Sequence, residues 1–170
     1  CDIVFVAVPT PTRLKDGGCD TACVRDALKL VGSGKIAVVK STIPPGALEE
    51  LQHEHPDKFL FHVPEFLTEK NAAYDAAHPT RNIIGVPDGA TPAHRDRAAE
   101  VRAVLPEAPV TLVCSAVESA LIKYLSNFFL TIQVLRANMA YDLSQAFGAQ
   151  WRIVRQGIVA DQRIGTSHSD

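Results

Sequence analysis

The chain lacks an excess of charge of either sign. Its 170 residues include 17 Lys and Arg against 19 Asp and Glu, which gives a formal net charge of -2. Proteins that bind nucleic acid usually show a surplus of Lys and Arg, so we expect no nucleic-acid partner. With 46% hydrophobic residues, the composition is that of an ordinary globular protein. The length allows one domain or parts of two.

Clusters of cysteine and histidine are also missing. The four cysteines are Cys1, Cys19, Cys23 and Cys114. They form neither a CxxC pair nor the spacing of an extracellular disulfide framework, and reduced thiols are typical of cytosolic proteins. We therefore predict a cytoplasmic protein. His53 and His55 lie close together, but no further Cys or His completes a metal site there, and we predict no metal.

Hydrophobic runs that could cross a membrane are absent, except that residues 115–148 are apolar and long enough to raise the question. A helix needs about 20 apolar residues to span the bilayer. This segment is interrupted by charged or amide side chains at Lys123, Asn127, Gln133, Arg136, Asn138 and Asp142. Because such groups are costly at membrane depth, we expect no membrane partner.

The chain also lacks a usable phosphate-binding fingerprint of the dinucleotide-binding proteins. Residues 32–37, GSGKIA, match the letters G-x-G-x-x-G/A. That fingerprint must follow a strand and open a helix, whereas these letters follow a predicted helix and open a predicted strand. We interpret them as a turn.

Short apolar runs rich in β-branched residues alternate with helical patterns along the first two thirds of the chain. The predicted strands are residues 3–8, 36–40, 59–63, 82–86 and 110–113, and the predicted helices between them are residues 20–31, 47–54 and 92–104. Strands that alternate with helices predict crossover units and a parallel sheet covered on both faces.

The longest element is a predicted helix over residues 115–148. Ser115 and Glu118 have the spacing of a capping box, and Gly148 suits the left-handed position just past a helix end. No Pro or Gly lies between them. At about 1.5 Å per residue the helix is about 48 Å long. Apolar side chains cover most of its circumference, which predicts burial against several partners or a second copy of the chain.

A polar line runs along one edge of this helix. Lys123, Asn127 and Thr131 follow one another at intervals of four residues, which places the lysine beside the asparagine on one face. A buried ammonium group needs a partner or a ligand, so one interpretation is an anion or oxyanion site. The alternative is that Lys123 extends to solvent and Asn127 caps a neighbouring loop.

Three proline-containing loops follow predicted strands, at residues 8–11, 40–46 and 63–69. In open sheets of this kind ligands bind beyond the carboxyl ends of the strands, so functional residues are expected in these loops. Glu65 and Glu69 are four residues apart, and one carboxylate can face a cleft while the other lies nearby. The alternative for each loop is a solvated turn.

Seven segments resemble the UDP-glucose/GDP-mannose dehydrogenase family in order and spacing over nearly the whole chain. They are DIVFVAVPTPT (2–12), VVKSTIPPG (38–46), PEFLTEKNAAYD (64–75), RNIIG (81–85), ESALIKYLSNFFL (118–130), GAQWRIVRQGIVAD (148–161) and RIG (163–165). The resemblance implies an NAD-dependent enzyme. It would oxidise the C6 primary alcohol of a nucleotide sugar, UDP-glucose or a related UDP- or GDP-sugar, to a carboxylate in two hydride transfers.

The resemblance also assigns roles by position. Thr42 and Glu65 would assist proton transfer through a water, while Lys123 and Asn127 would stabilise the alkoxide and later oxyanions. The residues beside the nicotinamide would be Val8, Pro9, Thr10, Thr42 and Glu69. The residues that contact the sugar nucleotide would be Glu65, Phe66, Leu67, Thr68, Lys123, Asn127 and Arg163, with Arg163 reaching the substrate of a second subunit.

The predicted fold class is α/β: the back half of a Rossmann-like parallel sheet, followed by a long helix and an all-α central dimerisation domain. Residues 1–113 would form the C-terminal part of the NAD-binding domain and residues 114–170 the central helical domain. In the family the helix at 115–148 implies a homodimer. The family's phosphate loop and catalytic cysteine have no counterpart here, so we expect an internal fragment that is inactive alone and exposes an apolar sheet edge.

Two alternatives come from other classes. The chain can be a non-catalytic dimerisation or nucleotide-sugar-binding module of the same fold. It can also be part of another dehydrogenase, of the β-hydroxyacid type, in which a lysine and an asparagine four residues apart would serve as well. The joint presence of Thr42, Glu65, Glu69, Lys123 and Asn127 favours the nucleotide-sugar dehydrogenase over both.

Overall fold

The structure, a computed structural model, describes residues 1–164 and divides into two compact units. The first unit is Cys1–Tyr124 and the second begins at Leu125. Gly165 of the RIG segment and the last five residues of the predicted second domain lie outside the described residues.

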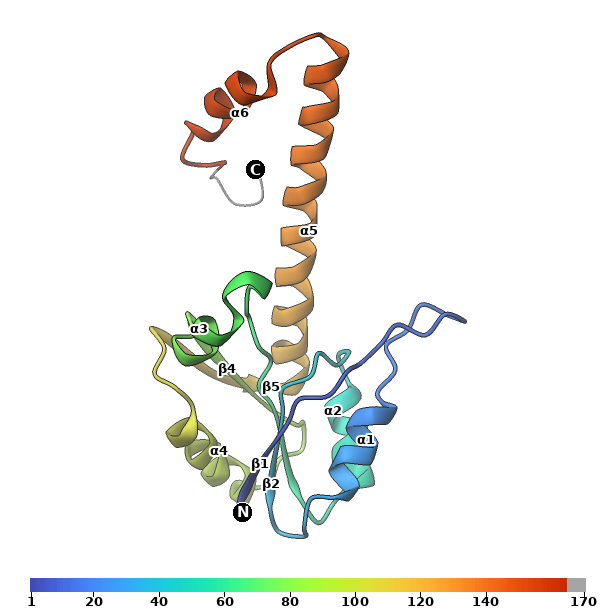
Figure 1. The fold of residues 1–170 in the computed structure, drawn as a ribbon. Helices are drawn as coiled ribbons and strands as arrows, with labels where there is room; N and C mark the ends of the chain where they lie inside the picture. The colour runs from blue at the N-terminus through green and yellow to red at the C-terminus, as the bar shows by residue number, and fades with distance from the viewer. Residues whose placement is uncertain (165–170) are drawn as a thin grey trace. The chain divides into compact units, whose positions relative to one another are not determined.

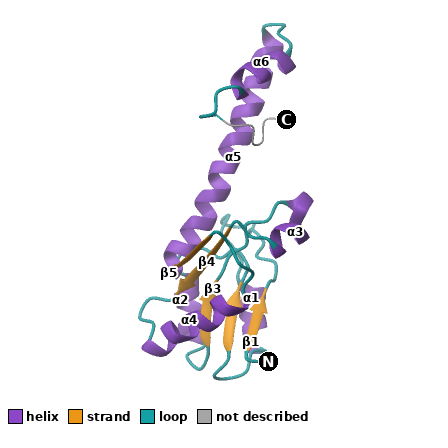
Figure 2. Cartoon of the chain, turned by 90° about the vertical axis from the view of Figure 1, so that its left-hand side faces the viewer, coloured by secondary structure: helices purple, strands orange, loops and turns teal. Residues whose placement is uncertain are grey.

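The first unit contains a five-stranded sheet with the strands in chain order (Figures 1 and 2). The strands are β1 (Ile3–Val6), β2 (Ile36–Val39), β3 (Phe59–His62), β4 (Arg81–Val86) and β5 (Val110–Ser115). All five lie where the apolar runs predict them. β1 is at one end of the sheet, and its Phe5 side chain is 47% exposed, as expected for an uncovered apolar edge.

The predicted helices are present as well. They are α1 (Ala22–Lys29), α2 (Ala47–Glu54), α4 (Pro92–Val104) and the long α5 (Ala116–Ala146). The sequence patterns missed the 3-10 turn η1 (Glu69–Asn71), α3 (Ala72–Ala77) and α6 (Trp151–Val159). α3 has six residues and none of them is buried, so it lacks the apolar stripe that marks a helix in a sequence.

The sheet is mixed, so the prediction of uniformly parallel strands is wrong at one step. The pairs β1 with β2, β2 with β3 and β4 with β5 are parallel, but β3 and β4 are antiparallel through His62 and Gly85. A parallel neighbour requires a crossover, usually a helix that packs on the sheet. The connection at residues 63–80 contains only the short η1 and the exposed α3, and the chain returns at the same edge of the sheet.

The reversal of strand direction explains why the helices lie on both faces. Crossovers between parallel strands are almost always right-handed, so the crossover from β4 to β5 places α4 on the face opposite α1 and α2 (Figure 1). Two hydrophobic cores result. One contains Leu28 of α1 and Leu51 of α2, and the other contains Phe61 of β3 and Val101 of α4.

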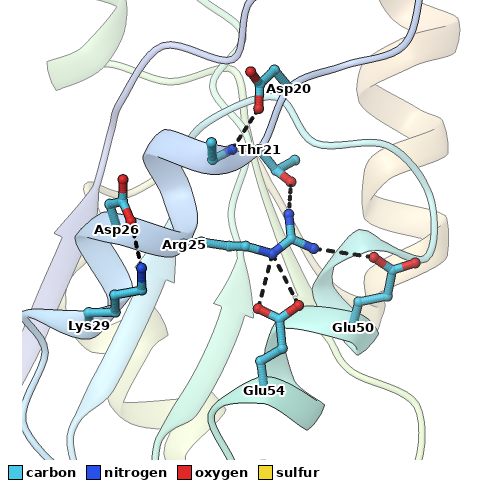
Figure 3. Close-up of polar contacts among 8 residues, drawn as sticks. Asp20, Thr21, Arg25, Asp26, Lys29, Glu50 and Glu54 are labelled. Carbon is cyan, nitrogen blue, oxygen red and sulfur yellow. Dashed lines mark hydrogen bonds and ion pairs between the residues drawn. The ribbon is translucent and has the colours of Figure 1, made fainter.

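α1 and α2 are also joined by a polar cluster on their outer surface (Figure 3). The Arg25 guanidinium donates to the Glu54 carboxylate at 3.0 Å and reaches Glu50 at 3.5 Å and the Thr21 hydroxyl. At the start of α1 the Asp20 carboxylate accepts a backbone hydrogen bond from the first turn. Exposed pairs of this kind contribute little stability, so the cluster mainly orients the two helices.

Both predicted ends of α5 are confirmed. The Ser115 N–H donates to the Glu118 carboxylate at 2.7 Å and the Glu118 N–H donates to Ser115 Oγ at 3.2 Å, which is a capping box. At the other end Gly148 has a φ of 67°, and the Ala149 N–H bonds to the Ser144 carbonyl at 2.8 Å. This is the Schellman arrangement.

The first turn of α5 lies directly on β4, and Gly85 makes this approach possible. A Cβ atom on Gly85 would lie 2.6 Å from the Cβ of Ser119 and 3.0 Å from the Cα of Ala116. Real Cβ atoms do not approach so closely. The glycine therefore sets the position of the helix turn that precedes Lys123.

The second unit contains most of α5 together with α6. Tyr141 of α5 and Trp151 of α6 pack edge to face, with ring centroids 5.9 Å apart. Many large apolar side chains of α5 are exposed in this unit, among them Leu125, Phe128, Phe129, Leu130, Ile132, Leu135, Met139 and Leu143. Monomeric proteins rarely expose such a surface.

Candidate functional site

The loops that follow β1 and β2 are tied together at the carboxyl edge of the sheet. Ser41 Oγ accepts from the Val8 N–H at 2.9 Å and donates to the Val8 carbonyl at 2.7 Å. Thr10 Oγ1 donates to the Thr42 carbonyl at 2.8 Å. The structure thus brings together Val8, Thr10 and Thr42, with Pro9 between the first two, as the position of the loops predicts.

Lys123 of α5 is bound to the loop that follows β3. Its side chain is buried, and Nζ donates to the Glu65 carbonyl at 2.6 Å and to Glu65 Oε1 at 3.0 Å. The alternative in which Lys123 extends to solvent is therefore wrong, because only 6% of the residue is exposed. The ammonium group has the partner that its burial requires.

The Glu65 carboxylate has a second donor and a second cation nearby. The Leu67 N–H donates to Oε2 at 2.8 Å. Burial by itself would raise the pKa of Glu65, but the hydrogen bonds from Leu67 and Lys123 and the charges of Lys123 and Lys40 outweigh it and lower the pKa. Glu65 is therefore an anion at neutral pH, able to accept a proton or a hydrogen bond.

The other residues of the PEFLT segment are held within the same unit. The Phe66 ring lies 3.9 Å from the Arg81 guanidinium and 5.5 Å from Lys123 Nζ. The Thr68 N–H and hydroxyl both donate to Asp75, at 2.8 and 2.7 Å. The resemblance implies that Leu67 and Thr68 contact the sugar nucleotide. Their backbone N–H groups are engaged by carboxylates of the chain itself.

A cavity of about 360 Å³ opens beside this segment. Glu65 to Thr68 line one side of it and Lys40 and Arg81 contribute cationic groups. Its size is that of a small-ligand pocket.

The other predicted site residues are described each within its own unit. Glu69 is exposed at the start of η1. Asn127 belongs to the second unit, where its carbonyl accepts from Thr131 Oγ1 at 2.9 Å. Arg163, also in the second unit, is exposed and pairs with Asp161 at 2.6 Å.

Sequence reasoning did not single out His62, which the structure places at the centre of the polar contacts. Its ring is fully buried, with Nδ1 3.0 Å from Ser119 Oγ and Nε2 3.3 Å from the Ser41 carbonyl. Burial lowers the pKa of His62 to about 4, with smaller contributions from the charges of Lys40 and Lys123. A histidine at the carboxyl end of a central strand was the available signal.

Metal-binding clusters and membrane-spanning helices are both absent from the described part of the chain. Within residues 1–164, no group of three or more His, Cys, Asp or Glu side chains is placed to hold a metal ion. No helix in that range is both long enough and apolar enough to cross a bilayer.

The loops at the carboxyl edge offer uncharged groups. At residues 8–10 and 41–42 these are backbone groups and the hydroxyls of Thr10, Ser41 and Thr42. The run GSGKIA lies at the opposite end of β2. It turns at Ser33 and Gly34, as predicted, and its last two residues open the strand. Among residues 1–164 no other run has the phosphate-binding fingerprint.

Comparison with known proteins gives the family of the chain. The profile described as the UDP-glucose/GDP-mannose dehydrogenase family, NAD binding domain, matches residues 1–104. A putative UDP-glucose 6-dehydrogenase of Bacillus subtilis is 32% identical over 97% of this chain and 40% of its own length. The UDP-glucose 6-dehydrogenase of Rickettsia typhi is 36% identical over 96% of this chain and 39% of its own length.

A solved structure gives the same result. The UDP-glucose dehydrogenase from the archaeon Pyrobaculum islandicum superposes with a TM-score of 0.79 and 32% identity, over 96% of this chain and 40% of that one. The fold and the loops at its carboxyl edge thus define a Rossmann-like, NAD-binding dehydrogenase domain. The chain belongs to the UDP-glucose/GDP-mannose dehydrogenase family, and the predicted cofactor, NAD, is confirmed. The chain spans about 40% of the length of the relatives that it matches.

Proposed function

We propose that this chain is part of an NAD-dependent nucleotide-sugar 6-dehydrogenase. Its substrate would be UDP-glucose or a related UDP- or GDP-sugar, whose C6 primary alcohol is oxidised to a carboxylate in two steps. The observation that carries the proposal is the ion pair between the buried Lys123 and the half-buried Glu65, which joins a cation and a carboxylate at the carboxyl edge of an NAD-binding sheet.

In the first oxidation the alcohol must lose its proton and a hydride. Glu65 is ionised and partly exposed, so it can accept the proton through a water that the Thr42 hydroxyl helps to orient. The Lys123 ammonium group then stabilises the alkoxide. Asn127 is proposed as the second donor to this oxyanion on its sequence spacing from Lys123 alone.

Bound NAD supplies the hydride acceptor. Val8, Pro9, Thr10 and Thr42 would hold the nicotinamide ring at the carboxyl edge, and Glu69 would lie beside it. The hydrogen bond between Thr10 and Thr42 keeps the two loops at a fixed separation. This rigidity lowers the entropic cost of orienting the ring.

The sugar nucleotide would lie along the PEFLT segment. Phe66, Leu67 and Thr68 are proposed to contact it together with Glu65 and Lys123. Since the N–H groups of Leu67 and Thr68 are engaged by carboxylates, contacts with the substrate through this segment would use its carbonyl and side-chain groups or require the carboxylates to move.

The second oxidation requires a thiol that holds the aldehyde as a thiohemiacetal. None of the four cysteines has the sequence context of the family's nucleophile, and burial together with the Glu118 charge raises the pKa of Cys114, which makes it a poor nucleophile. The thiol would therefore lie in a region that corresponds to the part of the relatives that this chain does not span.

The remaining proposals concern the whole protein. The division of the chain into an NAD-binding domain that ends at residue 113 and a central helical domain that begins at residue 114 stays a prediction. A homodimer through the exposed apolar side chains of α5 and a cytoplasmic location are proposed as well. Arg163 would then reach the substrate site of the partner subunit.

The test uses the protein in its natural length, with NAD and a panel of UDP-glucose, UDP-N-acetylmannosamine, GDP-mannose and 3-hydroxy acids. We expect NADH formation with a nucleotide sugar and none with 3-hydroxy acids. Turnover of 3-hydroxy acids alone would support the β-hydroxyacid type instead. Binding of a nucleotide sugar without any turnover would support the non-catalytic module.

A further inference from the structure

His62 lies where three segments of the first unit meet. Ser119, one turn before Lys123 on α5, contacts its Nδ1, and the carbonyl of Ser41, next to Thr42, contacts its Nε2. His62 itself ends the strand that leads to Glu65 three residues later. The ring therefore touches each segment that carries one of the catalytic residues proposed for this unit.

The hydrogen-bond partners determine the protonation of the ring. The Ser41 carbonyl can only accept, so Nε2 carries the proton and donates at 3.3 Å. Nδ1 is then an acceptor, and the Ser119 hydroxyl donates to it at 3.0 Å. The His62 carbonyl, at 3.2 Å from Ser119 Oγ, is the longer alternative. Both ring nitrogens have partners in the neutral form.

The contacts continue beyond the ring. Ser41 Oγ exchanges two hydrogen bonds with the backbone of Val8, so the loop after β1 belongs to the same chain of contacts. Ser119 and His62 are both fully buried. Hydrogen bonds in such a setting are strong, and an unpaired group there is costly, so the arrangement is rigid.

We propose that His62 is a positioning residue for the proposed dehydrogenase reaction. Through its neutral ring it would fix Lys123, Thr42 and Glu65 relative to one another and would transfer no proton itself. This inference rests on the proposed function, because His62 would act through three residues whose catalytic roles are part of that proposal.

Ser119→Ala tests the proposal with the smallest change, in the protein of natural length. It removes the contact between α5 and the ring and leaves the contact of His62 with Ser41 intact. Ser144→Ala is the matched control, since Ser144 is a buried serine of the same helix whose hydroxyl donates to the Ala140 carbonyl within that helix. Each variant is assayed for kcat, KM and the pH profile of kcat.

We expect Ser119→Ala to lower kcat about tenfold, because small displacements of catalytic groups are costly, with KM for NAD nearly unchanged. The acidic limb of its pH profile should move to higher pH. That limb depends on Glu65, which faces Lys123 and Lys40 and would lose part of the Lys123 contact. Ser144→Ala should change neither kcat nor the position of the acidic limb. An unchanged Ser119→Ala enzyme, or a lower kcat with an unshifted limb, would overturn the proposal.

An NMR measurement separates this proposal from the proposed function. With ¹⁵N-labelled histidine, the His62 ring should show a proton on Nε2 and none on Nδ1 at neutral pH. A charged ring, or a proton on Nδ1, would overturn the positioning role whatever the activity. A wild-type protein with the expected ring but no turnover would instead refute the proposed function and with it the catalytic consequence.

Discussion

A buried ammonium group such as that of Lys123 is stable only where partners replace its lost hydration. Glu65 provides this compensation with its carbonyl and its carboxylate. The same geometry leaves the cation close to the loops at the carboxyl edge, where an oxyanion would form. Lys123, whose burial the fold must compensate, is thus also the residue that would stabilise the oxyanion.

Replacement of Lys123 by methionine should therefore reduce turnover more than stability. We expect kcat to fall by about 10²- to 10³-fold, since removal of one oxyanion donor has effects of this size. Lys35→Met is the matched control, because Lys35 pairs with Asp2 at 2.7 Å on the surface. Steady-state kinetics with a nucleotide sugar would check the prediction, and equal losses in the two variants would contradict it.

The pKa of His62 also predicts how stability depends on pH. In the folded state the pKa is lowered from 6.5 to about 4, so the unfolded state binds the proton more readily. The contribution of His62 to stability is complete above pH 6.5 and is lost as the pH falls toward 4. At pH 5 the loss is about 2 kcal/mol.

Urea unfolding at pH 7.5 and pH 5 checks this prediction. Part of the loss of stability in the wild type should be absent in His62→Gln, whose side chain does not titrate. His94, whose pKa is also lowered by burial, is present in both proteins. Its contribution to the pH dependence of stability therefore cancels when the two proteins are compared. The same pH dependence in both proteins would contradict the prediction.

At the scale of elements, the packing of α5 on β4 depends on a single missing side chain. Gly85→Ala would place a Cβ 2.6 Å from that of Ser119 and should destabilise the protein by about 1–3 kcal/mol. Gly157→Ala in α6 is the contrasting control, because a Cβ there meets nothing within 4 Å. It should stabilise the helix by about 0.5–1 kcal/mol. Thermal unfolding should show a lower Tm for Gly85→Ala and a higher Tm for Gly157→Ala. An unchanged Tm of Gly85→Ala would contradict this packing argument.

The elements that the sequence predicts well depend on neighbouring residues. The capping box of Ser115 and Glu118 and the turn at Gly148 involve residues a few positions apart, and local chemistry decides them. The antiparallel step between β3 and β4 depends on where the chain goes after residue 63, and strand patterns do not contain direction. Hence strand positions were predicted and this strand direction was not.

The same distinction holds for the candidate site. That loops after strands meet at one edge follows from a general rule for α/β sheets, so the contact between Thr10 and Thr42 could be anticipated. Lys123 was singled out by its helical spacing from Asn127 and Glu65 by its loop after a strand. The bond between them joins residues 58 positions apart, and no sequence pattern paired the two. His62 was missed because a histidine at the end of a strand shows no role until the partners of its ring, Ser41 and Ser119, are placed.

At the scale of the molecule, the exposed apolar side chains of α5 are the feature that a single chain does not explain. If they form the proposed homodimer, Phe129→Glu should produce a monomer, because a buried unpaired carboxylate is costly. Tyr74→Glu on α3 is the control, since Tyr74 is similarly exposed, at 66% against 61%. Analytical ultracentrifugation would check the masses, and a monomeric wild type would contradict the proposal.

The proposed function is that of a part of an enzyme that oxidises a nucleotide sugar twice. The most direct measurement is the amount of NADH formed per nucleotide sugar consumed, with the protein in its natural length and NAD in excess. The account predicts about two NADH per sugar, because the route from alcohol to carboxylate through a thiohemiacetal includes two hydride transfers. A ratio near one would mean that the reaction stops at the aldehyde, and the absence of NADH with every nucleotide sugar tested would contradict the account.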